Sequence, residues 1–431
     1  KKYLMYLLKN SSYYFFLLGI LVAQNSFEDF KRKEAMAFED HKNSIESDYN
    51  NFVLKEKRDF QEFKKNVEEK WMNFKYSTST SYVSYDEDLK SRSIVDFDLG
   101  KVTVEVILDD KEDDESLNFE FDTKNRTRFG HLFQNFPKNN LLLISTGFLF
   151  YNQNADLIND EFSRSNTKPI FQNLSDKKIF KKLIKVLSEK DDSGKPLLKD
   201  QLIGKNGKII SPGKSAEIFA QEQIKENKKT VNSYKAKDGK IRNMFSIDFN
   251  LRSDHKETRG DLYTKEIFHQ SQRFKIDPAI AMAVTETESS FNPKATSHIP
   301  AYGLMQLVPV SGARDAYQYV YNKDKFLGKR YLYKPQNNIE LGCAYLGKIR
   351  HVYFKKIKDD EKAMICTVAA YNTGVGNVSK ALTNTTKISP LVKKVNKMSS
   401  NKLYSTLLTD LEHQETRDYL KKVWSRKEKY N

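Results

Sequence analysis

The sequence predicts an α+β protein in which a mixed region precedes an all-helical one. Apolar residues recur at helical spacing over 27–74, alternate with polar residues in short stretches of the middle region, and return to helical spacing after it. A chain of 431 residues is too long for one compact core and suits two or three domains. We expect a leader over 1–25, a mixed domain over 26–250 and a helical domain over 251–431.

The first 25 residues have the pattern of a secretory signal. Lys1 and Lys2 precede an apolar run over 13–23, and the polar residues Gln24 and Asn25 follow it. The run is shorter than a membrane span of about 20 residues, although an uncleaved anchor or a buried helix stays open. A lipid anchor would need a cysteine there. We therefore expect export to the periplasm or cell envelope, without lipidation.

The region up to residue 250 is expected to combine helices and strands. Residues 27–74 contain no Gly or Pro and predict one long amphipathic helix, or two packed together. Their aromatic stripe is expected to pack on the domain that follows, with a membrane surface as the alternative. The other predicted elements are strands over 95–99, 102–106 and 245–251, the first two joined by a tight turn at Gly100-Lys101, and helices over 175–187 and 215–227.

Positive charge gathers in the helical region. The chain has a formal net charge of +16, and residues 251–431 hold 31 Lys and Arg against 18 Asp and Glu. Such a surface fits an anionic partner, whether nucleic acid, anionic lipid or a cell-wall polymer, or it raises solubility. No nucleic-acid-binding motif accompanies the charge, so we expect no nucleic-acid partner. The predicted helices of this region cover 262–274, 278–290, 338–354, 360–372 and 414–429.

The few cysteines and scattered histidines exclude several kinds of site. Cys343 and Cys366 cannot supply a disulfide framework or a four-thiolate zinc site. They could pair in an oxidising compartment or remain as two buried thiols. The histidines lack metal-ligand spacing, so the sequence predicts no metal and no other cofactor.

The helix predicted from Pro278 carries a candidate catalytic acid. Asp277 suits the N-cap, and the apolar stripe of the helix leads to Glu288 on its inward face, in the last turn before Pro293. Burial and the negative end of the helix dipole both disfavour an ionised carboxylate there, which suits a general acid. On this pattern alone, an acid paired with a buried Arg or Lys is the favoured interpretation.

Four short motifs in a fixed order reverse that preference. They are ESSFNP at 288–293, AYGLMQL at 301–307, NIELGCAYL at 338–346 and AAYNTG at 369–374. Together they resemble the soluble lytic transglycosylase family, which implies a goose-lysozyme-like all-α fold for the C-terminal domain. The upstream helix and mixed region resemble a membrane-bound member of that family in pattern and order. Peptidoglycan glycan strands are the implied substrate, and the N-terminal domain could contact the membrane or other envelope proteins.

The resemblance implies a reaction that uses one acid. Glu288 would protonate the glycosidic oxygen between N-acetylmuramic acid and N-acetylglucosamine, and would then remove the proton from the muramoyl C6 hydroxyl to give a 1,6-anhydro end. No second acid of the motifs lies in a plausible facing position, whereas glycoside hydrolases ordinarily use two. A hydrolytic muramidase of goose-lysozyme type and a non-catalytic wall-binding scaffold are the alternatives.

The resemblance also gives roles to four further residues. Tyr371 is expected to hydrogen-bond Glu288, and Gln306 to contact a sugar. Ser297 is expected near the muramoyl C6 oxygen, and Asn372 either binds an N-acetyl group or caps its helix. Purely structural roles, such as a core tyrosine or a surface glutamine, are the alternatives.

Overall fold

A computed structural model describes residues 49–109, 173–297 and 300–431, together with Asp29, Arg32, Lys33, Met36 and Ser47. The chain forms two compact units, residues 1–67 and residues 68–431. The predicted leader over 1–25 lies outside the described residues. Within that description, no helix is both long enough and apolar enough to cross a membrane.

The helix predicted over 27–74 is confirmed for residues 49–68, but it ends there. The prediction of its last turns was wrong because tertiary contacts redirect Trp71. The indole N–H of Trp71 donates to the backbone oxygen of Leu89 at 2.7 Å, and the guanidinium of Arg92 lies 4.0 Å from the centre of the Trp71 ring. Helical spacing of aromatic residues cannot reveal such a competing partner.

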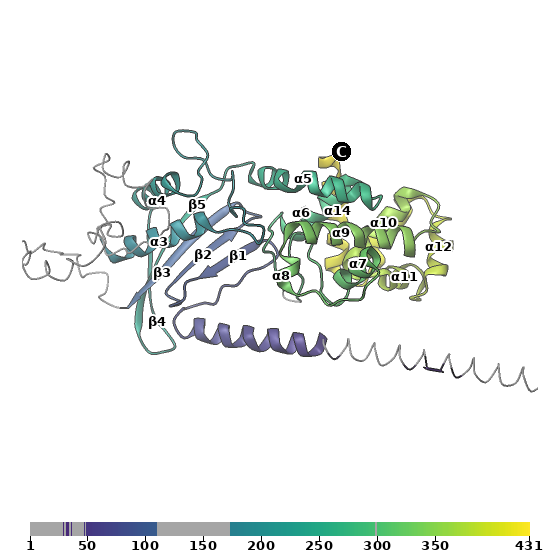
Figure 1. Cartoon of the computed structure of the whole chain (residues 1–431), viewed down its shortest axis with the longest axis horizontal. Coiled ribbons are helices and arrows are strands. Elements are labelled where there is room, and N and C mark those ends of the chain that lie inside the picture. Colours follow the sequence, from purple (N-terminus) through teal and green to yellow (C-terminus); the bar gives the residue numbers. More distant parts are fainter. Residues whose placement is uncertain are drawn as a thin grey trace, which may run out of the picture. The chain divides into compact units, whose positions relative to one another are not determined.

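The described residues between 68 and 250 form an antiparallel sheet of five strands, drawn as arrows in Figure 1. Its strand order is β1 (Ser81–Tyr85), β2 (Ser91–Asp96), β3 (Lys101–Asp109), β5 (Ile241–Asn250) and β4 (Thr230–Lys235). The tight turn predicted at Gly100 is confirmed: Asp96 pairs with Lys101, and Gly100 has a φ of 68°. A side chain on Gly100 would also collide with His255. The strands predicted over 102–106 and 245–251 are confirmed in β3 and β5, and β1 and β4 extend the sheet at its two edges. The strand predicted over 95–99 was wrong beyond Asp96, because the Asp96 side chain accepts from the backbone N–H groups of Asp98 and Leu99 and the chain turns there.

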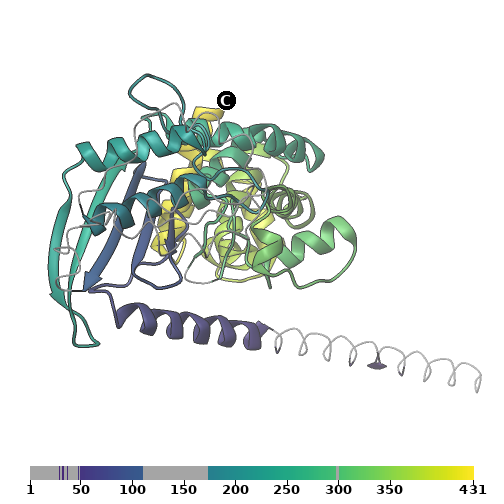
Figure 2. The same cartoon turned by 60° about the vertical axis from the view of Figure 1, so that its left-hand side comes forward.

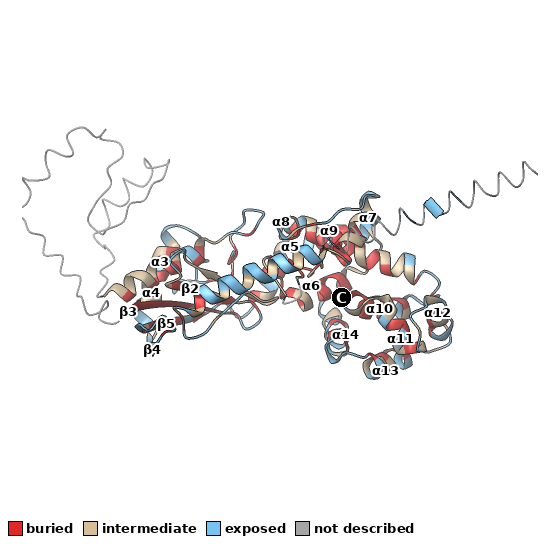
Figure 3. Ribbon diagram, turned by 90° about the horizontal axis from the view of Figure 1, so that it is seen from below, coloured by how far each residue is buried: buried red, intermediate tan, exposed pale blue. Residues whose placement is uncertain are grey.

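The helices α3 (Leu174–Ser188) and α4 (Lys214–Glu226) cover one face of this sheet (Figure 1). Alternate residues of β3 enter the core that they share, as the period-two pattern predicts. Val102, Val104 and Val106 are fully buried in one cluster with Ile179 and Leu183 of α3. In Figure 3, β3 is buried along most of its length, and buried residues also occur on the helices of the C-terminal region.

The helical region follows the sheet, and Figure 2 shows it turned by 60°. Its helices are α5 (His255–Arg273), α6 (Pro278–Ser289), α7 (Gly312–Tyr321), α8 (Lys329–Leu332), α9 (Pro335–Lys348), α10 (Asp360–Thr373), α11 (Val375–Thr383), α12 (Ile388–Val395), α13 (Ser400–Asp410) and α14 (Gln414–Lys427), with a π-helical turn, η3 (Ile349–Tyr353), and a 3₁₀ turn, η4 (Glu428–Tyr430). The five predicted helices are all present. α5 begins seven residues earlier than predicted because its first turns are polar, and they bury the charged Arg259 rather than an apolar stripe.

The two cysteines are separate buried thiols. Cys343 of α9 and Cys366 of α10 are fully buried and form no disulfide. Burial raises the pKa of each thiol to about 12. Of the two alternatives that the sequence left open, the structure contains the unpaired one.

Candidate active site

The helix α6 places Glu288 in its last turn, as predicted. The Asp277 side chain caps the start of the helix by accepting from the backbone N–H of Ala279 at 2.9 Å, and Pro278 occupies the first turn. The helix stops at Ser290, whose φ of 49° and ψ of 37° are left-handed. The neighbouring helices α5 and α14 pack on α6.

Glu288 is partly exposed, and its pKa is raised from 4.5 to about 8. The main cause is desolvation of the carboxyl by the surrounding protein, and the negative charge of Glu415 on α14 adds to it. The hydroxyl of Tyr419 acts in the opposite direction as a donor. No Lys or Arg among the described residues forms an ion pair with Glu288. The interpretation of Glu288 as half of a buried ion pair is therefore wrong.

Two buried tyrosines, Tyr371 of α10 and Tyr419 of α14, interact electrostatically with Glu288. Burial raises the pKa of both phenols well above 10, so both stay protonated. The Tyr371 hydroxyl donates to the backbone oxygen of Met305 at 2.8 Å. The phenol proton of Tyr371 thus goes to Met305, and the described residues contain no hydrogen bond between Tyr371 and Glu288; the expected role of Tyr371 beside Glu288 stays a prediction.

Tyr419 is a residue of this site that the sequence interpretation missed. Its hydroxyl is buried and has no hydrogen-bond partner of normal geometry among the described residues. Glu288 and Tyr371 are the groups whose charges act on it. The signal that could have found it is the inward face of α14, which Tyr419 shares with Leu420 and Val423.

A tight turn places Gln306 directly after Met305, whose backbone oxygen accepts from Tyr371. Gln306 has a φ of 45°, and its amide nitrogen donates to the backbone oxygen of Gly303 at 3.1 Å. The other amide atom, Oε1, is buried and has no hydrogen-bond donor within the described part of the chain. Asn338 of α9 holds this turn, because its side chain accepts from Met305 N–H at 2.7 Å and donates to the oxygen of Tyr302 at 2.8 Å. The turn is thus fixed, and it leaves one buried acceptor unused.

The structure places the two remaining predicted residues differently. Asn372 follows Tyr371 and is exposed; its Oδ1 accepts from the Thr416 hydroxyl at 2.8 Å, which ties α10 to α14. The Ser297 hydroxyl oxygen accepts from the backbone N–H of Ala301 at 3.1 Å and closes a loop. The contacts therefore join Glu288, Tyr371 and the Gln306 turn, whereas the place of Ser297 beside a substrate stays a prediction.

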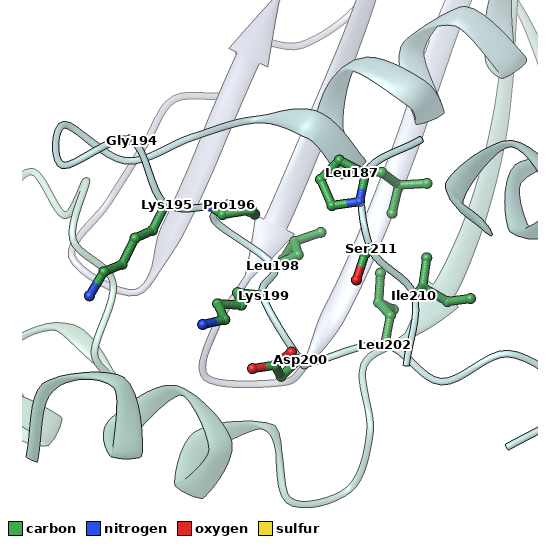
Figure 4. A pocket seen from close by; sticks show the side chains of 11 residues that line it. Leu187, Gly194, Lys195, Pro196, Leu198, Lys199, Asp200, Leu202, Ile210 and Ser211 are labelled. Carbon is green, nitrogen blue, oxygen red and sulfur yellow. The ribbon is translucent and has the colours of Figure 1, made fainter. Parts of the chain in front are cut away.

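A hollow in the sheet region lies apart from this group. Figure 4 shows a pocket of about 320 Å³ between Leu187, Leu198, Leu202, Ile210 and their neighbours. None of the residues that line it belongs to the four motifs around Glu288. The shape of this pocket alone indicates no reaction, whereas the helical region contains Glu288, an acid with a pKa of about 8.

Comparison with known families agrees with this assignment. The family model described as "Transglycosylase SLT domain" matches residues 265–390, which include Glu288, Gln306 and Tyr371. The model described as "Membrane-bound lytic murein transglycosylase C, N-terminal domain" matches residues 45–118. Both matches are to lytic transglycosylase families, so the resemblance seen in the sequence is confirmed.

Individual relatives define the family more narrowly. Membrane-bound lytic murein transglycosylase C of Salmonella arizonae is 31% identical over 250 residues, which are 57% of this chain and 67% of the relative. The protein of the same name from Sodalis glossinidius is 28% identical over 342 residues, or 79% of this chain and 80% of the relative. Among solved structures, the 70-kDa soluble lytic transglycosylase with bulgecin A matches 41% of this chain and 25% of its own, at 26% identity and a TM-score of 0.31. This chain belongs to the membrane-bound lytic murein transglycosylase C family, and it is a peptidoglycan lytic transglycosylase.

Proposed function

We propose that this enzyme cleaves the β-1,4 bond between N-acetylmuramic acid and N-acetylglucosamine, with Glu288 as acid and then as base, and that it leaves a 1,6-anhydro end. One observation carries the proposal. Glu288 is a partly exposed carboxyl with no cationic partner among the described residues, and its pKa is raised to about 8. Such a group keeps its proton at neutral pH and can give it to a sugar oxygen.

The reaction has two steps. In the first, the Glu288 proton moves to the glycosidic oxygen while the bond from that oxygen to the muramoyl C1 breaks, which releases N-acetylglucosamine with a free 4-hydroxyl. The oxygen of the substrate's own N-acetyl group stabilises the electron-poor C1. In the second step the C6 hydroxyl oxygen bonds to C1, and its proton returns to the Glu288 carboxylate. Glu288 ends as it began, and no water is consumed.

The two tyrosines suit a carboxyl that is ionised only between these steps. Both phenols stay neutral because burial raises their pKa, so Glu288 is the group that changes charge. The Tyr419 hydroxyl lowers the pKa of Glu288, and because no described residue accepts its proton it can donate to the transient carboxylate. Tyr371 fixes the Met305 carbonyl and with it the turn that carries Gln306.

Unused hydrogen-bonding atoms provide the contacts to the sugar. The buried Oε1 of Gln306 has no protein donor in the described structure, and an N–H or hydroxyl of the substrate would satisfy it. The amide nitrogen of the exposed Asn372 can donate to an N-acetyl oxygen, because Thr416 engages only the Oδ1 atom. We keep Ser297 as the neighbour of the muramoyl C6 oxygen.

The test is mass spectrometry of the fragments that the full chain releases from purified peptidoglycan. Wild type should give ends lighter by one water than hydrated sugars, and Glu288→Gln should release none. Glu415→Gln is the matched control, since Glu415 is the acid whose charge reaches Glu288. Hydrated ends that vanish in Glu415→Gln would establish a two-acid muramidase instead. Binding without release by wild type would favour the scaffold.

We also propose that the enzyme works in the cell envelope, where its substrate lies. The relatives are named as membrane-bound, and the apolar run over 13–23 is the part of this sequence that would export or anchor it. Fractionation of cells with and without residues 1–25 tests this. Envelope proteins as partners of the N-terminal domain remain a prediction.

A further inference from the structure

The segment that follows Glu288 is a strained turn. Ser290 has a φ of 49° and Phe291 a φ of 58°, so two consecutive residues with side chains are left-handed. This conformation is unfavourable for any residue other than glycine, and it persists where the surroundings over-determine it. The turn is therefore held in place by contacts outside α6, and these contacts also set where the last turn of α6 ends.

Arg259 of α5 makes the main contact. Its side chain is buried, and its Nε donates to the backbone oxygen of Ser290 at 2.8 Å. Its Nη2 donates to the backbone oxygen of Phe97 at 2.8 Å, and Nη1 to Oε1 of Gln201 at 2.5 Å. One rigid guanidinium thus joins the turn after Glu288 to two loops of the sheet region.

Stability alone does not explain a charge at this position. No acid among the described residues forms an ion pair with Arg259, although the charges of Asp98, Glu286 and Glu257 act on it from farther away. Its hydrogen-bond partners are two backbone oxygens, one amide oxygen and, at 3.4 Å, the Nδ1 atom of His255. Desolvation lowers its pKa to about 10. Burying a guanidinium with no acid in direct contact is costly, and an apolar side chain would avoid that cost. What the guanidinium adds is directional: three fixed donors that hold three separate segments.

Further contacts fasten the rest of the segment to the sheet region. The Ser290 hydroxyl donates to Asp98 at 3.2 Å. The Asn292 amide donates to the backbone oxygen of Ser79 at 3.3 Å. The backbone N–H of Thr296 donates to the oxygen of Thr78 at 3.2 Å. The segment from Ser290 to Thr296 is therefore fastened to the sheet region at both of its ends, and Ser297 follows Thr296.

We propose that Arg259 is a positioning residue for the reaction, which anchors the turn after Glu288 to the sheet region and so fixes the direction of the Glu288 carboxyl. The sheet region then forms part of the catalytic apparatus although it supplies no reacting group. This inference rests on the proposed role of Glu288. It concerns the rate of the chemical step rather than the binding of substrate.

The test measures kcat and KM of the full chain on soluble oligosaccharides of alternating N-acetylmuramic acid and N-acetylglucosamine. Arg259→Lys keeps the charge and removes the fork of donors. We expect kcat to fall about tenfold, equivalent to about 1.4 kcal/mol in the barrier, with KM changed less than about twofold. Rates are taken per folded molecule, as measured by circular dichroism. An unchanged kcat per folded molecule would overturn the proposal.

A second pair of variants covers the case in which Arg259→Lys does not fold. Asp98→Ala removes the acceptor of the Ser290 hydroxyl, together with an ion pair to Lys256, from a side chain that is 47% exposed. Asp248→Ala is the matched control, an acid of the same sheet that is 45% exposed and paired with Lys101. We expect a fall in kcat of about threefold for Asp98→Ala alone. Equal rates for the two variants would refute the positioning role.

The same series separates this proposal from the proposed function. Active wild type with inactive Glu288→Gln establishes the catalytic acid, and the Arg259 and Asp98 variants then test positioning alone. Inactive wild type would defeat the proposed function, and the positioning role would fall with it.

Discussion

Replacement of Glu288 by Gln should change the stability of the protein as well as its activity, in a way that depends on pH. The carboxyl has a pKa of about 8 in the folded chain, against 4.5 without the protein around it. A raised folded pKa stabilises the fold fully below the unfolded value, and this contribution is lost as pH rises through the folded value. Between pH 4.5 and 8, wild type therefore loses stability that Glu288→Gln does not lose.

The size of the effect follows from the two pKa values. Each pH unit above the unfolded pKa costs the wild-type fold about 1.36 kcal/mol, because the unfolded chain releases the Glu288 proton and the folded chain keeps it. At pH 7 the free energy of unfolding is therefore about 3 kcal/mol lower than at acidic pH. The Glu288 side chain is partly exposed, so solvent weakens the electrostatic effect of the protein on its carboxyl. We therefore expect a loss of about 2 kcal/mol in the free energy of unfolding. The variant should be the more stable protein at neutral pH, and the proposed mechanism expects it to be inactive.

Thermal unfolding of both proteins, followed by circular dichroism across this pH range, measures the difference. The variant and wild type should unfold at similar temperatures near pH 4.5 and diverge steadily up to about pH 8. Glu415→Gln serves as the control, because it removes an exposed acid of the same site. If the difference between Glu288→Gln and wild type does not vary with pH, Glu288 is not the desolvated acid that the mechanism needs.

Two further substitutions test the supports of α6 and of the Gln306 turn. Tyr430→Phe removes a donor that lies 2.6 Å from the buried Glu286, and should cost about 1.5–3 kcal/mol in thermal stability; an unchanged Tm would contradict this. Gly342→Ala places a methyl group in steric overlap with the sulfur of Met305, and should lower the free energy of unfolding by about 1–3 kcal/mol and also lower kcat. Gly376→Ala is the control: its nearest neighbour, Thr386, lies 3.7 Å from the added methyl group, so neither stability nor kcat should fall.

Local rules account for the parts of the fold that the sequence predicted. The alternation around Val102 and Val104 and the glycine at position 100 were sufficient for a hairpin, since both depend on neighbouring residues. The cap at Asp277 was sufficient for the start of α6. The end of the first helix was not predictable, because Trp71 leaves it for a carbonyl 18 positions away.

The residues of the candidate site also fall into those that local sequence could predict and those that depend on distant contacts. Glu288 was found because its motif and its place on a helix face are local features. Tyr419 was missed because it reaches Glu288 from a helix more than 100 positions away, and only the packing of α14 on α6 brings the two together. Tyr371 was found, but its partner is a backbone oxygen, and every residue carries one. Composition and spacing therefore find the acid but cannot choose between acceptors.

The hydrogen bonds from Thr78 and Ser79 to the segment after α6 have a consequence for how the enzyme comes into being. They join positions about 200 residues apart, so closing that loop is among the costlier events of folding. A chain whose helices have formed alone lacks these contacts and has the Glu288 turn unsupported. The proposed positioning role therefore predicts that glycan cleavage starts only when the whole fold is complete, and that activity appears during refolding when the sheet docks on the helical region.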